Sequence, residues 1–250
     1  MSEHPVAIVT GGSRGIGAAT ASCLARAGYE LCINYLADAA SAYALLDELE
    51  QYGGGAIAVQ ADVGSEADVT RLFETVDRRL GRVTALVNNA GIVQPQAGID
   101  DLDGDRIDRI LRTNVTGTLL CCREAVRRMS TGRGGQGGAI VNVSSIAART
   151  GSPNEYIDYA ASKGAVDTLT RGLATEVAAV GIRVNAVRPG FINTEMHADG
   201  GEPDRVQRLA PSIPLGRGGE PEEIAELIAW LLSAAASYVT GSIIDAAGGR

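Results

Sequence analysis

The chain has 250 residues, of which 45% are hydrophobic and 21% charged, so it can bury a large core as one α/β domain, and disordered and fibrous classes are excluded. Its net charge of −8 leaves no basic face for nucleic acid, and its most apolar stretch, residues 227–236, is too short to span a membrane. Four cysteines, two of them adjacent, and the lack of a leader pattern predict a reducing, cytoplasmic location.

Short apolar runs alternate with helical patterns along the whole chain. Strands are predicted at residues 6–9, 31–34, 56–59, 85–87, 140–143, 182–187 and 242–245. Helices are predicted at residues 16–27, 39–51, 69–80, 105–129, 159–180 and 221–233. Because buried parallel strands need helical crossovers, this alternation predicts a single domain, 1–250, with a Rossmann-type doubly wound seven-stranded parallel sheet and helices on both faces. Such sheets bind ligands at the carboxyl ends of their strands.

The turn after the first strand, Thr10 to Gly17, reads TGGSRGIG. Its glycines permit a sharp turn, close approach of the backbone to a pyrophosphate, and close packing of the following helix. The start of that helix adds unpaired N–H groups and partial positive charge. The spacing differs from the G-x-G-x-x-G fingerprint but predicts the same function, a turn that binds the phosphates of a dinucleotide.

The end of the second strand favours NADP over NAD. An acid at this place binds the adenosine ribose and repels a 2′-phosphate, whereas this chain has Asn34 and Tyr35. Arg14, in the glycine-rich turn, supplies the positive charge that a 2′-phosphate needs. Asp38 lies nearby in the sequence and carries the opposite charge.

Two asparagine-containing segments follow. Residues 88–91 read NNAG after the fourth strand, where the glycine lets a cofactor ribose come close. Asn114 lies on the apolar stripe of the helix at 105–129, where a buried amide must be hydrogen-bonded. Periodicity leaves both a structural and a catalytic role open for Asn114.

Acid–base chemistry is predicted after the fifth strand. Ser144 and Ser145 end that strand, and Tyr159 and Lys163 stand four residues apart at the start of the next helix, on one face. A phenol has an ordinary pKa of about 10, and a neighbouring ammonium lowers it by stabilising the phenolate. Tyr159 is therefore the predicted general acid or base.

The ordered set of the TGxxxGxG turn, NNAG, Asn114, Ser145, the Tyr159–Lys163 pair and Pro189-Gly190 resembles the short-chain dehydrogenase/reductase family over nearly the whole chain. The resemblance implies NAD(P)-dependent interconversion of an alcohol and a carbonyl. The implied roles are proton transfer for Tyr159, hydrogen bonding to the carbonyl oxygen for Ser145, ribose binding and tuning of Tyr159 for Lys163, and holding of a relay water for Asn114. The implied cofactor contacts are Gly11, Ser13, Arg14, Gly15, Ile16, Gly17, Asn34, Asp62, Val63, Asn89, Ala90, Gly91, Tyr159, Lys163, Pro189, Gly190, Ile192 and Thr194.

Two rivals for the catalytic roles stay open. Ser145 precedes Tyr159 by 14 positions, about one more than is usual in the family, so Ser144 is an alternative to Ser145. Tyr156 is a second phenol, but Ala160 rather than a lysine follows it by four residues.

The remaining expectations concern the surroundings of the site. Residues 191–214 are predicted to form a substrate lid, with Met196 and His197 on the substrate side. No metal site is predicted, because His4 is the only other histidine. Apolar-striped helices and the family resemblance predict a homotetramer. The expected partner is a small carbonyl compound or alcohol of unidentified structure. The alternative function is a non-catalytic NADP(H)-sensing regulator on the same fold, against which the complete Asn, Ser, Tyr and Lys set argues.

Overall fold

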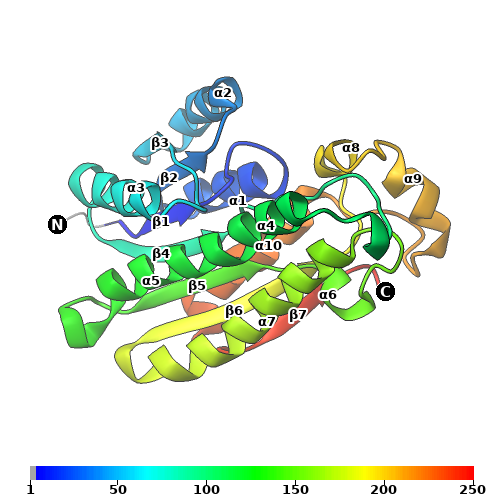
Figure 1. Ribbon diagram of the computed structural model, residues 1–250. Coiled ribbons are helices and arrows are strands. Elements are labelled where there is room, and N and C mark those ends of the chain that lie inside the picture. The colour runs from blue at the N-terminus through cyan, green and yellow to red at the C-terminus, as the bar shows by residue number, and fades with distance from the viewer. Residues whose placement is uncertain (1–3) are drawn as a thin grey trace.

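The computed structural model describes residues 4–250 and contains one parallel seven-stranded sheet in the order β3-β2-β1-β4-β5-β6-β7 (Figure 1). The strands are β1 (Val6–Val9), β2 (Glu30–Tyr35), β3 (Ala56–Gln60), β4 (Val83–Asn88), β5 (Gly138–Val143), β6 (Ile182–Pro189) and β7 (Ile243–Ala246). From β1 the chain first adds strands on one side, β2 and β3, and then on the other, β4 to β7. This is the predicted Rossmann-type doubly wound sheet, so the fold prediction is confirmed.

Helices cover both faces of the sheet. They are α1 (Gly15–Arg26), α2 (Ala39–Leu49), α3 (Glu66–Arg79), α4 (Gly104–Leu111), α5 (Gly117–Met129), α6 (Ala147–Thr150), α7 (Ile157–Val177), α8 (Met196–Asp199), α9 (Arg205–Leu209) and α10 (Pro221–Leu232). One hydrophobic core joins α1, α2 and α10 to the sheet, and a second joins α3, α5 and α7 to the opposite face. Figure 1 shows α3, α5 and α7 in front of the sheet.

The segment predicted as one helix at 105–129 is divided. A π-helical stretch, Arg112–Thr116, separates α4 from α5. Such a turn shifts the phase of the helix, so Leu111, on the predicted buried stripe, is 39% exposed, while Asn114 is fully buried. Periodicity does not predict such a phase shift.

The functional edge of the sheet is the one at which the strands end. Figure 1 shows α6, α8 and α9 together beyond this edge, close to the C-terminus. Residues 191–214 supply α8 and α9, two short helices that the sequence pattern does not predict. This segment lies beside the turns after β5 and β6 and forms one wall of the pocket described below.

All four cysteines are buried and unpaired. Burial raises the pKa of each of the adjacent thiols Cys121 and Cys122. Across residues 4–250, no three His, Cys, Asp or Glu side chains are grouped to hold a metal ion. No helix in the same range has the length and apolar character needed to cross a bilayer.

Candidate active site

The glycine-rich turn between β1 and α1 is packed too closely for larger residues. Gly11 has φ of +57°, and a Cβ there would lie 2.9 Å from Ala90 Cα. A Cβ on Gly17 would lie 2.3 Å from the Gly11 carbonyl oxygen and 2.6 Å from Asn89 Nδ2. The turn therefore needs glycine at both positions in order to pack against the NNAG segment, and Gly11 and Gly15 leave backbone without side chains along the cleft.

The NNAG segment holds this turn in place. Asn89 Nδ2 donates to the carbonyl oxygens of Thr10 (3.1 Å) and Gly11 (2.8 Å), and the backbone N–H groups of Asn89 and Ala90 donate to Thr10 Oγ1. Helix α1 has no side-chain cap and no acid in its first turn. Its first N–H groups and the positive end of its dipole are available to an anion.

Asn34, at the end of β2, hydrogen-bonds to the same turn. It is 2% exposed, and its Oδ1 accepts from Gly11 N (3.3 Å), while its Nδ2 donates to the carbonyl oxygens of Val59 (3.3 Å) and Ala61 (3.0 Å). The structure thus places Asn34 under the turn, where it braces the ends of three neighbouring strands.

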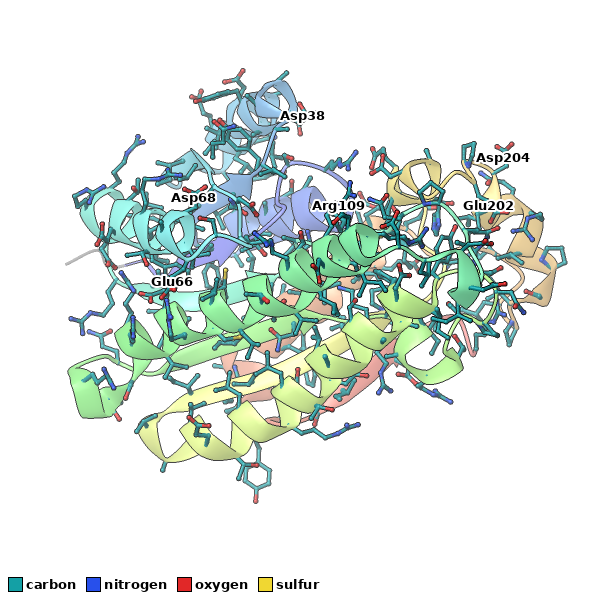
Figure 2. All side chains as sticks on the ribbon, in the orientation of Figure 1. Asp38, Glu66, Asp68, Arg109, Glu202 and Asp204 are labelled. Carbon is teal, nitrogen blue, oxygen red and sulfur yellow. The ribbon has the colours of Figure 1, made fainter. Side chains whose placement is uncertain are left out.

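The charged groups near the predicted adenosine site are already paired. Arg14 Nη2 contacts Asp199 Oδ2 at 2.7 Å, and both side chains are about half exposed. Asp38 caps α2 by accepting from Ser41 N (3.0 Å) and Ser41 Oγ (2.6 Å), and these hydrogen bonds hold the pKa of Asp38 below its usual value. Figure 2 shows Asp38 at the start of α2.

The structure brings most of the predicted cofactor contacts to one cleft of about 570 Å³. Lining it are Gly11, Ser13, Arg14, Gly15, Ile16, Asn34, Asp62, Val63, Asn89, Ala90, Gly91 and Thr194. Gly17 lies beneath this lining, and Tyr159, Lys163, Pro189, Gly190 and Ile192 line the adjoining pocket. The two cavities share Ile16, Asn89, Val93, Thr194 and Met196, so they are continuous.

The two candidate serines have different surroundings. Ser144 is 2% exposed, and its Oγ donates to the Lys163 carbonyl oxygen (3.3 Å). Ser145 Oγ accepts from Ala147 N (3.1 Å), lines the same pocket as Tyr159 and acts to lower the pKa of that phenol. Geometry therefore favours Ser145 over Ser144 as the serine that acts together with Tyr159.

Lys163 is buried behind the phenol, at the end of β5. Its Nζ donates to the Val143 carbonyl oxygen (2.7 Å) and lies 5.6 Å from the centre of the Tyr159 ring. Burial lowers the pKa of Lys163 to about 8, and the negative charge of Asp167 acts in the opposite direction. The ammonium is thus held in place by backbone, next to the phenol.

The predicted lowering of the Tyr159 pKa is wrong in direction. Burial raises the pKa of Tyr159 to about 12, and a hydrogen bond with Ser145 acts in the opposite sense. The structure places Lys163 Nζ over the ring, 5.6 Å from its centre, and in a hydrogen bond with the Val143 carbonyl oxygen. Desolvation outweighs an ammonium in that position.

Asn114 ties the chain after β4 to helix α7. Its Oδ1 accepts from Ile92 N (2.9 Å), and its Nδ2 donates to Ile92 O (3.0 Å) and Ser162 Oγ (3.0 Å). An unpaired buried amide would cost about 1–3 kcal/mol, so these bonds matter for stability. A Cβ on Gly91 would lie 3.3 Å from Lys163 Nζ and 3.5 Å from Asn114 Oδ1, so both polar groups lie next to the Gly91 backbone.

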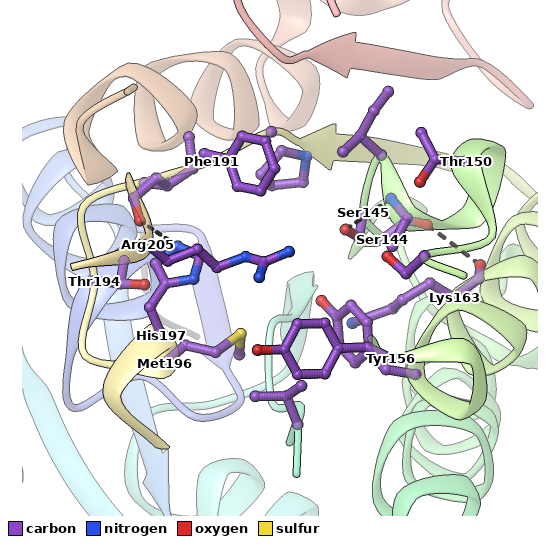
Figure 3. Close-up of a pocket in the computed structure, with 18 of the residues that line it drawn as sticks. Ser144, Ser145, Thr150, Tyr156, Lys163, Phe191, Thr194, Met196, His197 and Arg205 are labelled. Carbon is purple, nitrogen blue, oxygen red and sulfur yellow. Dashed lines mark hydrogen bonds between the residues drawn. The ribbon is translucent and has the colours of Figure 1, made fainter. Parts of the chain in front are cut away.

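The pocket beside these groups has a volume of about 230 Å³ (Figure 3). Residues 191–214 contribute Phe191, Ile192, Thr194, Met196, His197 and Arg205 to it. His197 Nε2 lies 3.0 Å from the Ile192 carbonyl oxygen, and burial lowers the pKa of this histidine. The rival phenol, Tyr156, donates to the Gly200 carbonyl oxygen (3.3 Å), so it bonds to the segment containing the predicted lid residues and not to a serine.

The sequence analysis did not identify Arg205, a buried cation of this pocket. Arg205 is 5% exposed, and it pairs with Glu155 (2.5 Å) and Glu202 (2.5 Å). Figure 3 shows its side chain directed into the pocket between the rings of Phe191 and Tyr156. Arg205 and Glu155 are 50 positions apart in regions without a recognisable motif, so no sequence signal links them.

Comparisons with known proteins agree with this geometry. A family model described as enoyl-(acyl carrier protein) reductase matches residues 11–250. The chain is 58% identical to the Escherichia coli K12 protein named "Uncharacterized oxidoreductase YgfF", over 98% of this chain and 99% of that protein. A short-chain type dehydrogenase/reductase from Mycobacterium marinum matches with a TM-score of 0.91 and 37% identity, covering 98% of this chain and 94% of that one. A 3-ketoacyl-(acyl-carrier-protein) reductase from Brucella melitensis, complexed with NADH, matches with a TM-score of 0.90 and 35% identity, covering 98% of each chain.

Proposed function

Because the chain belongs to the short-chain dehydrogenase/reductase family, we propose that it is an NADP(H)-dependent oxidoreductase that interconverts a small carbonyl compound and its alcohol. The observation that carries this proposal is the convergence of Ser145, Tyr159 and Lys163 on one pocket. That pocket is continuous with the cleft at the glycine-rich turn, so proton-transferring groups stand beside a dinucleotide-sized site.

The residues of the cleft fit a nicotinamide dinucleotide. The bare backbone at Gly11 and Gly15 and the uncapped start of α1 suit its pyrophosphate. Asp62 and Val63 would flank the adenine end, and Ile192 and Thr194 the nicotinamide end. When bound, the cofactor supplies or accepts the hydride.

The side chains of the pocket divide the proton chemistry among them. A phenol with a pKa of about 12 stays protonated at neutral pH, so Tyr159 is ready to donate a proton to a carbonyl oxygen. Ser145 would donate a second hydrogen bond to that oxygen. Lys163, which is held by the Val143 carbonyl, would stabilise the resulting phenolate. Asn114 fixes the Gly91 loop against α7 and so holds the edge of the cleft in position.

The NADP preference rests on Arg14. No acid ends β2, and Asp38, the first acid beyond that strand, is occupied in capping α2. Arg14 is half exposed at the mouth of the cleft, and a 2′-phosphate would exchange with Asp199 for its guanidinium. The Brucella melitensis neighbour was solved with NADH, so the preference needs measurement.

The test is a pair of matched phenol variants. Purified protein is assayed by NADPH and NADH absorbance against a panel of aldehydes and ketones. Tyr159→Phe should lower kcat by about 10²–10⁴-fold with the fold intact, because it removes the proton donor. Tyr156→Phe loses only the bond to the Gly200 carbonyl and should retain activity within a few-fold. Full activity of Tyr159→Phe would exclude the assigned role, and tight cofactor binding with no turnover on any compound would favour the sensing alternative.

We also propose that residues 191–214 act as a substrate lid, because α8 and α9 form the pocket wall opposite Ser145. For assembly we propose a homotetramer, supported by exposed apolar side chains on α4, α5, α7 and α10: Leu111, Leu119, Ile157 and Trp230. Light scattering on the purified protein tests the assembly. Four unpaired cysteines support a cytoplasmic location.

A further inference from the structure

The substrate pocket carries more positive than negative side chains, although the protein as a whole has a net charge of −8. Within residues 4–250, its lining includes Lys163, Arg205 and Arg250, and Glu155 is its only carboxylate. Lys163 belongs to the proton-transferring group described above. The two arginines have no part in that chemistry, so their presence in the pocket needs another explanation.

Arg205 is held rigidly and is balanced by acids. Its ion pairs with Glu155 and Glu202 fix the guanidinium, and Arg208 binds the same Glu202 at 2.7 Å. The guanidinium carbon lies 5.0 Å from the centre of the Tyr156 ring and 5.4 Å from that of Phe191. Arg205 is therefore a fixed part of the pocket wall whose charge is compensated by its two carboxylates.

Arg250 adds a guanidinium that has no side-chain carboxylate as a partner. Its guanidinium carbon lies 4.8 Å from the centre of the same Phe191 ring, and among the described residues no Asp or Glu side chain forms an ion pair with it. The backbone that carries it is fastened, since Leu215 N donates to Gly248 O (3.1 Å) and Arg250 N to Ala247 O (3.3 Å). These backbone hydrogen bonds hold residues 248 and 250 next to the pocket, where the Arg250 side chain lines it.

Both guanidinium groups lie against the Phe191 ring, but only Arg205 is compensated by carboxylates. An anion bound in the pocket would give Arg250 the partner that it lacks. Much of the remaining wall is apolar or aromatic and includes Val93, Ile146, Phe191 and Met196. Such a wall suits a hydrocarbon body, and a guanidinium fork suits a carboxylate. Ser145, Tyr159 and Lys163 belong to the same cavity lining, and Figure 3 shows Ser145 and Lys163 across the pocket from Arg205.

We propose that the substrate is a carbonyl or alcohol compound that also bears a carboxylate, which Arg250 binds with Arg205 as its neighbour. The hydrocarbon part lies along Phe191, and the reacting carbon faces Ser145 and Tyr159. The orientation of the reacting group rests on the proposed function, whereas the recognition of the anion does not. Arg250 is then a specificity-determining residue.

The test compares two probes of nearly equal shape, benzoate and benzamide, by calorimetric titration of the whole protein with saturating NADP⁺. Benzoate should bind at least tenfold more tightly than benzamide, and added NaCl should weaken benzoate binding only. Arg250→Gln should weaken benzoate binding by about tenfold and leave benzamide unchanged. Arg78→Gln, which removes an equal charge from the exposed surface of α3, is the matched control and should change neither.

Two results would overturn the inference: equal affinity of the wild-type protein for both probes, or benzoate binding that Arg250→Gln does not weaken. The titration needs no turnover, so it gives an answer whether or not the protein reduces carbonyls. A kinetic comparison of 4-carboxybenzaldehyde with benzaldehyde then separates the two claims. Turnover of both aldehydes with equal kcat/KM retains the oxidoreductase and excludes the carboxylate preference, while anion binding without turnover of either does the reverse.

Discussion

The two halves of the sheet's carboxyl edge differ in the groups that form them. The half at β1, β2 and β4 is made of backbone and short side chains, with Gly11, Thr10 and Asn89 bonded to one another within 3.1 Å. The half at β5, β6 and residues 191–214 is made of long side chains, with Arg205 held between rings and carboxylates from distant segments. The first half is suited to a fixed, common ligand, and the second to discrimination among substrates.

After the loss of the Tyr159 phenol, the largest effect should come from the Ser145 hydroxyl in the second half. Ser145→Ala removes the donor next to Tyr159 and should lower kcat by about 10²-fold, as loss of one donor to a developing oxyanion does elsewhere. Ser144→Ala removes a bond to the Lys163 carbonyl oxygen and should cost at most a few-fold. Steady-state kinetics of both variants measure the difference. Equal losses in the two variants would mean that neither serine has a distinct chemical role.

In the first half, a methyl group should suffice to damage the site. Gly17→Ala places a Cβ 2.3 Å from a backbone oxygen, so the turn must move. We expect the Kd of the cofactor to rise at least tenfold and the stability to fall by about 1–3 kcal/mol. Gly172→Ala, on α7 at a position where the added Cβ would have no neighbour within 4 Å outside its own helix, is the control and should bind cofactor normally. Fluorescence titration and thermal unfolding of both variants give the answer, and unchanged cofactor affinity in Gly17→Ala would contradict the tight turn.

The same division decides how much the sequence predicts. The cofactor half follows from local patterns: the glycine-rich turn at Thr10 to Gly17 joins β1 to α1, as predicted. Burial of the strands on both faces fixes their positions to within a few residues. These features depend on neighbours in the chain, which a single sequence displays.

The substrate half depends on contacts that a sequence does not display. Arg205 meets Glu155 only because α9 folds over the start of α7. The π-helical stretch at Asn114 changes which residues of α4 and α5 face inward. The direction of the Tyr159 pKa shift was wrong because it depends on where Lys163 Nζ lies and on how deeply the phenol is buried. Motifs identify these residues without giving their surroundings.

Lys163 lies where the two halves meet, and its titration should be visible in the reaction. Its pKa of about 8 means that the ammonium predominates below about pH 8 and is lost above it. We expect kcat/KM for carbonyl reduction to be level near pH 7 and to fall by about tenfold per pH unit above pH 8. Tyr159, with a pKa of about 12, does not titrate in this range.

Asp167→Asn provides the matched test of this fall in kcat/KM above pH 8. The charge of Asp167 raises the pKa of Lys163, so its removal should move the fall in kcat/KM to lower pH. Arg188, the hydrogen-bonded partner of Asp167, retains its second carboxylate, Asp245, in this variant. A profile that stays level to pH 10, or a limb that Asp167→Asn does not move, would exclude Lys163 as its source.

The smallest effect concerns the contact that joins the two halves, the 2.7 Å pair between Arg14 and Asp199. Asp199→Asn frees the guanidinium for a 2′-phosphate, so the Kd of NADP⁺ should fall while that of NAD⁺ stays unchanged. Both side chains are about half exposed, and exposed ion pairs contribute little, so the expected gain is about two- to fivefold. Asp204→Asn makes the same charge change in the same segment without touching Arg14, and it should leave both affinities unchanged.

The sign of this result decides whether the halves communicate. If Asp199 and a 2′-phosphate compete for Arg14, then by reciprocity NADP binding weakens the hold of α8 on the glycine-rich turn, and the wall formed by residues 191–214 loosens when the cofactor enters. Equal gains in Asp199→Asn and Asp204→Asn would instead reflect the general loss of negative charge, and the two halves would then be independent in binding as well as in construction.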